Sequence, residues 1–332
     1  MGFQAVEVKQ NSRRLVLLVA AFIAIYVFWG STYLAIKYAI ETMPPFIMAG
    51  ARFLFAGGLL FLVSLWSKDF EWPTWKHWRT SLVVGTLLLL GGNGGVVFAE
   101  KYISSGLAAL LVASEPFWIV LLSWLWLKRG RPGKPVIFGL VLGFVGVALL
   151  VVGQNVDGSA GGGFYQTAAT IAIILAAFSW AVGSIYGLRA PVPKSSIMTS
   201  GMQMLSGGAV LMLASVPKGE WSTFAISDIS ANSWFGLGYL IVFGSLIGFT
   251  AYSWLLKNAQ PSMVSTYAYV NPVIAVILGW LIAGETLTGQ ILLGAGLVVA
   301  SVVLITMQNS PPETEETEGD LGISVAPSRA SA

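Results

Sequence analysis

Apolar residues follow one another along this chain in about ten runs of roughly 20 residues, separated by short polar segments. A helix of about 20 apolar residues is long enough to cross the ~30 Å hydrocarbon layer of a membrane. The runs are continuous and do not alternate with polar positions, as the strands of a membrane β-barrel do. We therefore predict an all-α integral membrane protein with ten transmembrane helices, at residues 15–36, 46–66, 80–99, 107–127, 136–152, 167–188, 197–216, 234–256, 263–283 and 288–307.

The second half of the chain repeats the first half. Glu115-Pro116 is followed eight residues later by a tryptophan, and Asn271-Pro272 is followed by another at the same spacing. Internal repeats of this kind are typical of membrane transporters. The same shift of 156 positions superimposes Lys101 on Lys257, Gly92 on Gly248 and Val120 on Val276.

The number of spans predicts how the two halves are oriented. Ten spans divide into two sets of five, and five is odd, so the second set begins on the opposite side of the membrane. We predict two inverted-topology five-helix repeats around a central cavity. The expected domains are a cytoplasmic N-terminus (1–14), repeat 1 (15–152), a glycine-rich loop (153–166), repeat 2 (167–307) and a disordered cytoplasmic tail (308–332).

Composition and charge support a membrane location and set the orientation. Hydrophobic residues make up 56% of the chain and charged residues 10%, with a mean hydropathy of +0.77; soluble proteins carry about 25% charged residues. With a cytoplasmic N-terminus, fourteen Lys and Arg residues fall in cytoplasmic segments, three fall in opposite-side loops, and Arg52 lies within a span. The positive-inside rule then places both termini in the cytoplasm of a multi-pass inner (plasma) membrane protein.

Glu115 is the deepest acidic residue predicted in the first half. It falls about eight residues inside the fourth predicted helix, where a carboxylate is costly unless it is protonated, paired or facing water. Pro116 follows it and removes a backbone donor within that helix. We predict a substrate-binding or proton-coupling role for Glu115, the alternative being a structural hydrogen bond to a neighbouring helix.

Arg52 is the one basic residue within a predicted span. A guanidinium group inside the bundle suits a bidentate contact with a substrate carboxylate, or a pair with Glu115. The alternative is that its side chain extends to the membrane interface. Gln203 is the polar residue in the matching stretch of the second half.

Aromatic and polar residues at mid-membrane positions complete the candidate cavity. Rings with a polar group suit a site for amphipathic organic molecules, although helix packing is the alternative for each residue. Gly92, Pro116, Gly248 and Pro272 are candidate hinges, and close helix packing explains such glycines equally well. The further cavity candidates are Trp29, Ser31, Tyr33, Asn93, Trp180, Ser184, Tyr252, Tyr267, Tyr269 and Asn271.

The sequence lacks the residues that several classes of function require. The chain has no cysteine, its one histidine is His77 in a predicted loop, and all its aspartates fall outside the predicted spans. It also lacks the Gly-x-x-x-x-Gly-Lys-Ser/Thr loop that binds ATP. We therefore expect no metal, no cofactor, no nucleic-acid partner and no enzymatic activity.

Five short segments carry a resemblance to a known family. Trp29-Gly30-Ser31-Thr32-Tyr33 with Ala49-Gly50-Ala51-Arg52-Phe53, Ser179-Trp180-Ala181, and Thr266–Pro272 followed by Gly284-Glu285-Thr286-Leu287 resemble EamA-type members of the drug/metabolite transporter superfamily. The resemblance covers residues 15–306 and is strongest for bacterial inner-membrane exporters, one of which exports aromatic amino acids.

The resemblance implies ten helices and a central cavity that opens alternately to either side. It implies a secondary transporter that exports small organic solutes, amino acids foremost, across the bacterial inner membrane. The alternatives are an exporter of drugs or other hydrophobic metabolites, and a non-transporting membrane receptor. A ten-helix unit in the lipid bilayer that encloses its own cavity for a small-molecule substrate suits a monomer. By position, the cavity candidates that it supports are Trp29, Asn93, Glu115, Trp180, Tyr252, Tyr267 and Asn271.

Overall fold

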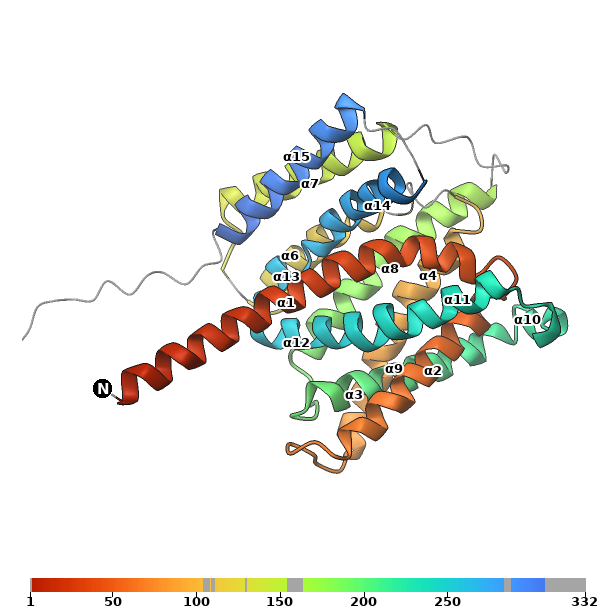
Figure 1. Cartoon of the computed structure of the whole chain (residues 1–332), viewed down its shortest axis with the longest axis horizontal. Helices are drawn as coiled ribbons and strands as arrows, with labels where there is room; N and C mark the ends of the chain where they lie inside the picture. Colours follow the sequence, from red (N-terminus) through yellow and green to blue (C-terminus); the bar gives the residue numbers. More distant parts are fainter. Residues whose placement is uncertain are drawn as a thin grey trace, which may run out of the picture.

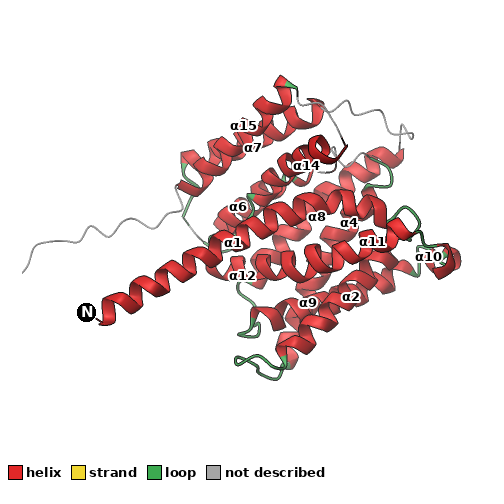
Figure 2. Cartoon of the chain, in the orientation of Figure 1, coloured by secondary structure: helices red, strands yellow, loops and turns green. Residues whose placement is uncertain are grey.

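The apolar runs fold into helices. The computed structural model describes residues 2–103, 108, 111–128, 130–153, 164–283 and 288–307, and these residues form no β-strand (Figure 2). The connecting loop expected at 153–166 lies mostly outside the described residues, as do the turn at 284–287 and the tail at 308–332.

Six stretches of helix are long and apolar enough to cross a membrane: Arg14–Ala39, Pro45–Ser64, Trp75–Ala99, Thr167–Gly187, Ser196–Ser215 and Ala231–Asn258. They coincide with six of the ten predicted spans. Shorter apolar helices occupy three of the other four positions, at Glu115–Leu125, Lys134–Leu149 and Gly289–Ile305, and the helix Tyr267–Ala283 occupies the last. The count of ten and the inversion of the halves stay predictions.

The first half contains seven described helical segments, one of them π-helical. They are α1 (Gly2–Ala39), α2 (Pro45–Ser64), α3 (Trp75–Gly85), the π-helical η1 (Thr86–Gly94), α4 (Gly95–Ala99), α6 (Glu115–Leu125) and α7 (Lys134–Gly153).

The second half follows the same plan. Its described segments are α8 (Phe164–Gly187), α9 (Ser196–Ser215), α10 (Glu220–Thr223), the 3-10 turn η2 (Ile226–Asp228), α11 (Ala231–Tyr239), the π-helical η3 (Leu240–Phe249), α12 (Thr250–Asn258), α13 (Pro261–Val264), α14 (Tyr267–Ala283) and α15 (Gly289–Met307).

Local sequence determines where several helices begin. Thr74 and His77 form a capping box at the start of α3, which satisfies backbone donors that an α-helix leaves free. Ser195 accepts a hydrogen bond from the backbone N–H of Met198 at the start of α9. The Glu220 carboxylate accepts hydrogen bonds from the first backbone N–H groups of α2, at 3.2 and 2.9 Å.

The two halves pack against each other through matching helices. α2 packs along α9, and α7 packs along α15 at the opposite edge of the bundle (Figure 1). Between these pairs, α1 packs against η3 and α14, and α8 packs against η1 and α6. The first helix of each half thus contacts the third and fourth helical regions of the other half, which encloses a space at the centre.

The crossing of α2 and α9 depends on glycine. A Cβ atom built on Gly57 would lie 2.7 Å from the backbone nitrogen of Leu205 and 2.9 Å from the carbonyl oxygen of Gly201. A Cβ on the adjacent Gly58 would meet nothing within 4 Å. Small residues let helix backbones approach closely in lipid, so close packing explains Gly57.

We expect Gly57→Ala to destabilise the protein and Gly58→Ala not to do so. Alanine favours a helix by about 1 kcal/mol over glycine, but overpacking at Gly57 costs about 1–3 kcal/mol. The thermal unfolding midpoint of the purified protein in detergent measures the difference. Equal midpoints for the two variants would contradict the close approach.

Candidate functional site

The central space is a cavity of about 680 Å³, counting the part open to solvent. Its walls come from both halves of the chain and combine aromatic rings, an arginine, a glutamate and two asparagines. The lining residues are Trp29, Thr32, Tyr33, Ile36, Arg52, Phe53, Gly92, Asn93, Val96, Val112, Glu115, Ala176, Ala177, Trp180, Gly244, Phe249, Tyr267 and Asn271.

Arg52 is buried at the cavity wall, with 3% of its surface exposed. Its Nε donates a hydrogen bond to Ser245 Oγ at 2.7 Å, and its Cζ lies 4.6 Å from the centroid of the Phe53 ring. Gly244 leaves room for the guanidinium group, because a Cβ there would lie 2.6 Å from Nη2. The Nη1 atom has no hydrogen-bond partner. The side chain therefore does not extend to the membrane interface, and a charged donor faces the cavity.

Glu115 contributes an acidic group to the same cavity. Its carboxyl group is buried, its Oε2 accepts a hydrogen bond from the Tyr267 hydroxyl of the other half, and its Oε1 has no partner. Among the interactions of these described residues, Glu115 forms no ion pair with Arg52. A guanidinium group and a carboxyl group thus line one cavity without direct contact with each other.

The helix around Glu115 differs from the sequence prediction. Glu115 is the first residue of α6, after a turn at residues 113–114, and not a position inside a continuous helix over 107–127. Pro116 falls in the first turn, where its missing N–H breaks no helical hydrogen bond. A carboxylate at a helix N-terminus is also favoured by the helix dipole, which helps to explain why an acid is tolerated here.

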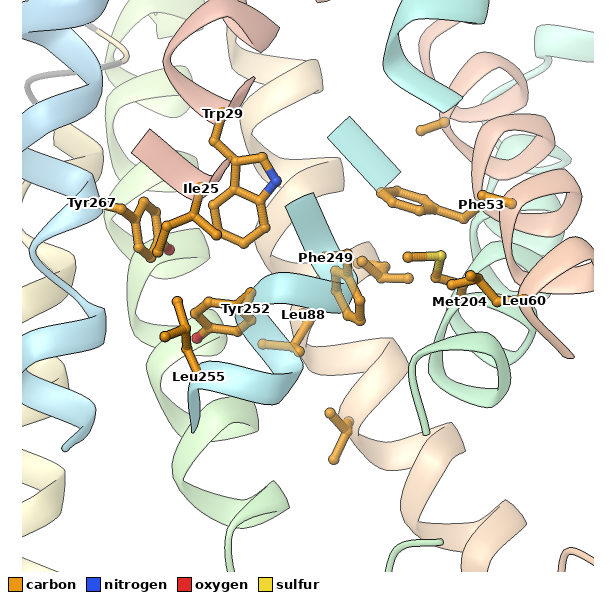
Figure 3. Close-up of a cluster of buried hydrophobic side chains, with 14 of the residues drawn as sticks. Ile25, Trp29, Phe53, Leu60, Leu88, Met204, Phe249, Tyr252, Leu255 and Tyr267 are labelled. Atoms are coloured by element: carbon orange, nitrogen blue, oxygen red, sulfur yellow. The ribbon is translucent and has the colours of Figure 1, made fainter. Parts of the chain in front are cut away.

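Four aromatic rings form a layer at one end of the cavity. The Trp29 ring lies 4.8 Å from Tyr267, 5.1 Å from Tyr252 and 5.6 Å from Trp180, centroid to centroid. Figure 3 shows the labelled rings of Trp29, Tyr252 and Tyr267 converging from separate helices. Trp180 Nε1 donates to the Tyr252 hydroxyl at 2.9 Å, which fixes the layer further.

The two tryptophans pack reciprocally on glycines. A Cβ on Gly248 would lie 2.4 Å from Trp29 Nε1, and a Cβ on Gly92 would lie 2.6 Å from Trp180 Cε3. Each tryptophan therefore rests on a glycine from the other half of the chain. Both glycines lie in the π-helical segments η1 and η3, a conformation that is rare and frequent at functional sites.

A second, narrower cavity lies beyond the aromatic layer. Along α8, Ala177 and Trp180 line the first cavity and Ser184 lines the second. Segment η3–α12 lines the two cavities in the same order, and η1 lines them in the reverse order along the chain, with Leu88 in the second cavity and Gly92 in the first. The two cavities are therefore stacked along the helix axes. The second cavity is lined by Val84, Leu88, Gly183, Ser184, Gly187, Leu188, Val192, Thr199, Gln203, Tyr252, Ser253, Leu256 and Lys257.

The candidate residues therefore fall into three groups. Trp29, Tyr33, Arg52, Asn93, Glu115, Trp180, Tyr267 and Asn271 line the first cavity, and Ser184, Gln203 and Tyr252 line the second. Ser31 and Tyr269 line neither.

Ser31 and Tyr269 lie away from both cavities because of helical register. Ser31 forms a hydrogen bond with the Tyr239 hydroxyl at 2.6 Å, since it lies off the face that carries Trp29 and Tyr33. Tyr269 donates to the Leu140 carbonyl at 3.2 Å and packs between α7 and α15. It is two positions, and so about 200°, from Tyr267 around α14.

Sequence reasoning missed several contributors to the site. Thr32, Phe53, Gly244 and Phe249 line the cavity, and the spacing of Thr32 and Ile36 from Trp29 along α1 is the signal that could have identified the first of them. Glu100 was also missed, because it follows the third apolar run. Both of its carboxylate oxygens are buried without a partner.

Comparisons with known proteins agree with a transporter fold. The model of the EamA-like transporter family matches residues 16–152 and 167–307. The chain is 39% identical to the uncharacterized inner membrane transporter YedA of Escherichia coli (strain K12) over 296 residues, which is 89% of this chain and 92% of YedA. It is 28% identical to the uncharacterized transporter YvbV of Bacillus subtilis (strain 168), over 91% of this chain and 94% of YvbV.

A solved crystal structure shares the fold. Its TM-score is 0.69 at 18% sequence identity, and the match covers 90% of this chain and 98% of the other.

Proposed function

Because the chain belongs to the EamA-like transporter family, we propose that it is a secondary transporter of the bacterial inner membrane. It exports small organic solutes, amino acids foremost and aromatic ones included, by alternating access. The observation that carries the proposal is the presence of a basic and an acidic side chain, Arg52 and Glu115, both buried on the walls of one cavity.

A zwitterionic amino acid complements this pair. The unpartnered Nη1 of Arg52 suits the substrate carboxylate, and the unpartnered Oε1 of Glu115 suits the substrate ammonium group. Charged hydrogen bonds of this kind are stronger than neutral ones. A solute that carries one charge leaves one of these buried groups without a partner, which lowers its affinity.

The remaining walls suit an apolar or aromatic side chain. The rings of Trp29, Phe53, Trp180, Phe249 and Tyr267 surround the cavity. Rings prefer tilted or edge-on contacts that add about 0.5–1.5 kcal/mol beyond burial. The amide of Asn93, whose Oδ1 is buried without a partner, is an additional contact for a substrate donor.

The stacked cavities support alternating access. We propose ten spans, inverted halves and cytoplasmic termini, which put the second cavity on the cytoplasmic side because Arg189, Lys194 and Lys257 lie at that end of the helices. The four-ring layer then separates the cytoplasm from the binding cavity. Tilting of the halves about η1 and η3 would open this layer and close the other end.

Glu115 is also the site of proton coupling in this proposal. Its carboxylate can hold either a proton or the substrate ammonium group, so the two compete for one site and are exchanged across the membrane in opposite directions. Asn271, its counterpart in the repeat, bears no charge, so this coupling uses one half only.

Transport in proteoliposomes tests the proposal. We expect saturable counterflow of a labelled aromatic amino acid that is inhibited by other zwitterions. The matching amine without the carboxylate and the matching acid without the amine should compete at least about tenfold more weakly, the loss that one unpaired buried group entails. Equal competition by uncharged aromatic compounds would favour an exporter of hydrophobic metabolites, and no saturable flux for any amino acid would refute the proposal.

A further inference from the structure

Glu100 carries a second buried carboxyl group, just outside the lining of the cavity. It follows the last residue of α4, and neither of its carboxylate oxygens is exposed or has a hydrogen-bond partner. An ionisable group in such a position is costly to bury. It requires a proton, a cation or water to compensate for the loss of solvent.

Helical register places Glu100 one turn beyond the cavity wall. Asn93 and Val96 line the cavity, and Glu100 follows Val96 by four residues, so that all three share one face of η1 and α4. On α1, Tyr33 lines the cavity and lies within electrostatic reach of both Glu100 and Glu115. Tyr33 therefore lies near both carboxyl groups.

The charged residues near Glu100 indicate that it lies at the end of the bundle opposite the aromatic layer. Lys37, one turn after Tyr33 on α1, lies within electrostatic reach of Glu100 and is exposed. α2 and α8 also pack on α4. In their described residues, the titratable groups on those two helices are Arg52, Tyr165 and Tyr186.

We propose that Glu100 is the outer-side proton acceptor of the transport cycle. This proposal rests on the proposed export function. A proton from external water binds one carboxylate oxygen of Glu100 to give the neutral acid. It then passes by way of Tyr33 and cavity water to Glu115 as the substrate ammonium group leaves. Glu115 releases the proton to the cytoplasm when the next substrate binds, so one proton enters for each amino acid exported.

The test compares Glu100→Gln with Glu41→Gln, a matched control at an exposed glutamate near the same end of the bundle. In proteoliposomes, Glu100→Gln should leave counterflow exchange at equal pH within about twofold of the unmodified protein. It should reduce accumulation driven by a pH gradient by about tenfold or more, the effect of removing a proton-transfer group. Glu41→Gln should change neither.

Three outcomes would overturn the proposal. The first is unchanged gradient-driven accumulation in Glu100→Gln. The second is an equal loss of exchange and accumulation, which would make Glu100 a structural or substrate-binding residue. The third is accumulation by the unmodified protein that depends on a sodium gradient and not on the pH gradient.

A substrate-free measurement separates this proposal from the export function. Infrared difference spectra of the protein in nanodiscs, recorded as the pH is changed, detect the protonation of carboxyl groups that are shielded from water. We expect one such band to be missing in Glu100→Gln and present in Glu41→Gln. If no amino acid is transported, the export proposal fails, and the spectra alone decide whether Glu100 binds protons.

Discussion

Replacing Glu115 with glutamine is expected to abolish net amino-acid transport while the protein remains folded. The glutamine amide keeps the shape of the side chain, and its carbonyl oxygen can accept the hydrogen bond that Tyr267 now donates to Oε2. What is lost is the charge that attracts the ammonium group. Removing one member of a buried charged pair costs about 2–5 kcal/mol, which predicts at least about a 30-fold loss in kcat/KM for counterflow in proteoliposomes.

The exposed Glu41→Gln variant is the control for this loss. It removes the same charge from the chain and should leave the flux unchanged. If Glu115→Gln kept both the flux and its dependence on pH, the contact between Glu115 and Tyr267 would be purely structural. In that case neither substrate binding nor proton coupling could be assigned to Glu115.

Replacing Arg52 with lysine is expected to raise the KM for amino acids by about tenfold or more, the loss that one unsatisfied charged hydrogen bond entails. Arg52 uses Nε to bind Ser245 and leaves Nη1 without a partner. A lysine has a single ammonium group and cannot serve Ser245 and a substrate carboxylate in the same planar arrangement. Counterflow at several substrate concentrations measures the change in KM.

The Arg52→Lys variant should also change the selectivity of transport between solutes with and without a carboxylate. The weakening should apply to solutes with a carboxylate and not to the matching amines, whose contacts lie elsewhere. Ser245→Ala serves as the companion variant, because it frees the guanidinium group without removing it and should have a smaller effect. A uniform loss for carboxylates and amines would assign Arg52 to helix packing.

Much of the fold followed from hydropathy because lipid constrains the chain so strongly. A segment that crosses the hydrocarbon layer must be helical, long and apolar, and six predicted spans are such helices. Hydropathy is insensitive to the hydrogen-bond pattern within a helix. It therefore gave no sign of the π-helical winding of η1 and η3, or of the turn just before Glu115.

The site was predicted less completely. The rarity of charge within apolar runs was enough to identify Arg52 and Glu115. Glu100 adjoins Lys101 at the end of a run, so it resembled the start of an ordinary polar connection. Ser31 and Tyr269 were predicted to line the cavity from residue type alone. They lie off the faces of α1 and α14 that carry Trp29 and Tyr267.

The reciprocal seating of Trp29 on Gly248 and Trp180 on Gly92 has a consequence for the origin of the molecule. A chain of one repeat would carry one tryptophan without the glycine on which its ring packs, and one glycine without the matching tryptophan. Such an ancestor would need a second copy of itself to complete the layer. Gene fusion would then make a permanent pair from a transient one, and the two copies would afterwards be free to diverge at matching positions such as Glu115 and Asn271.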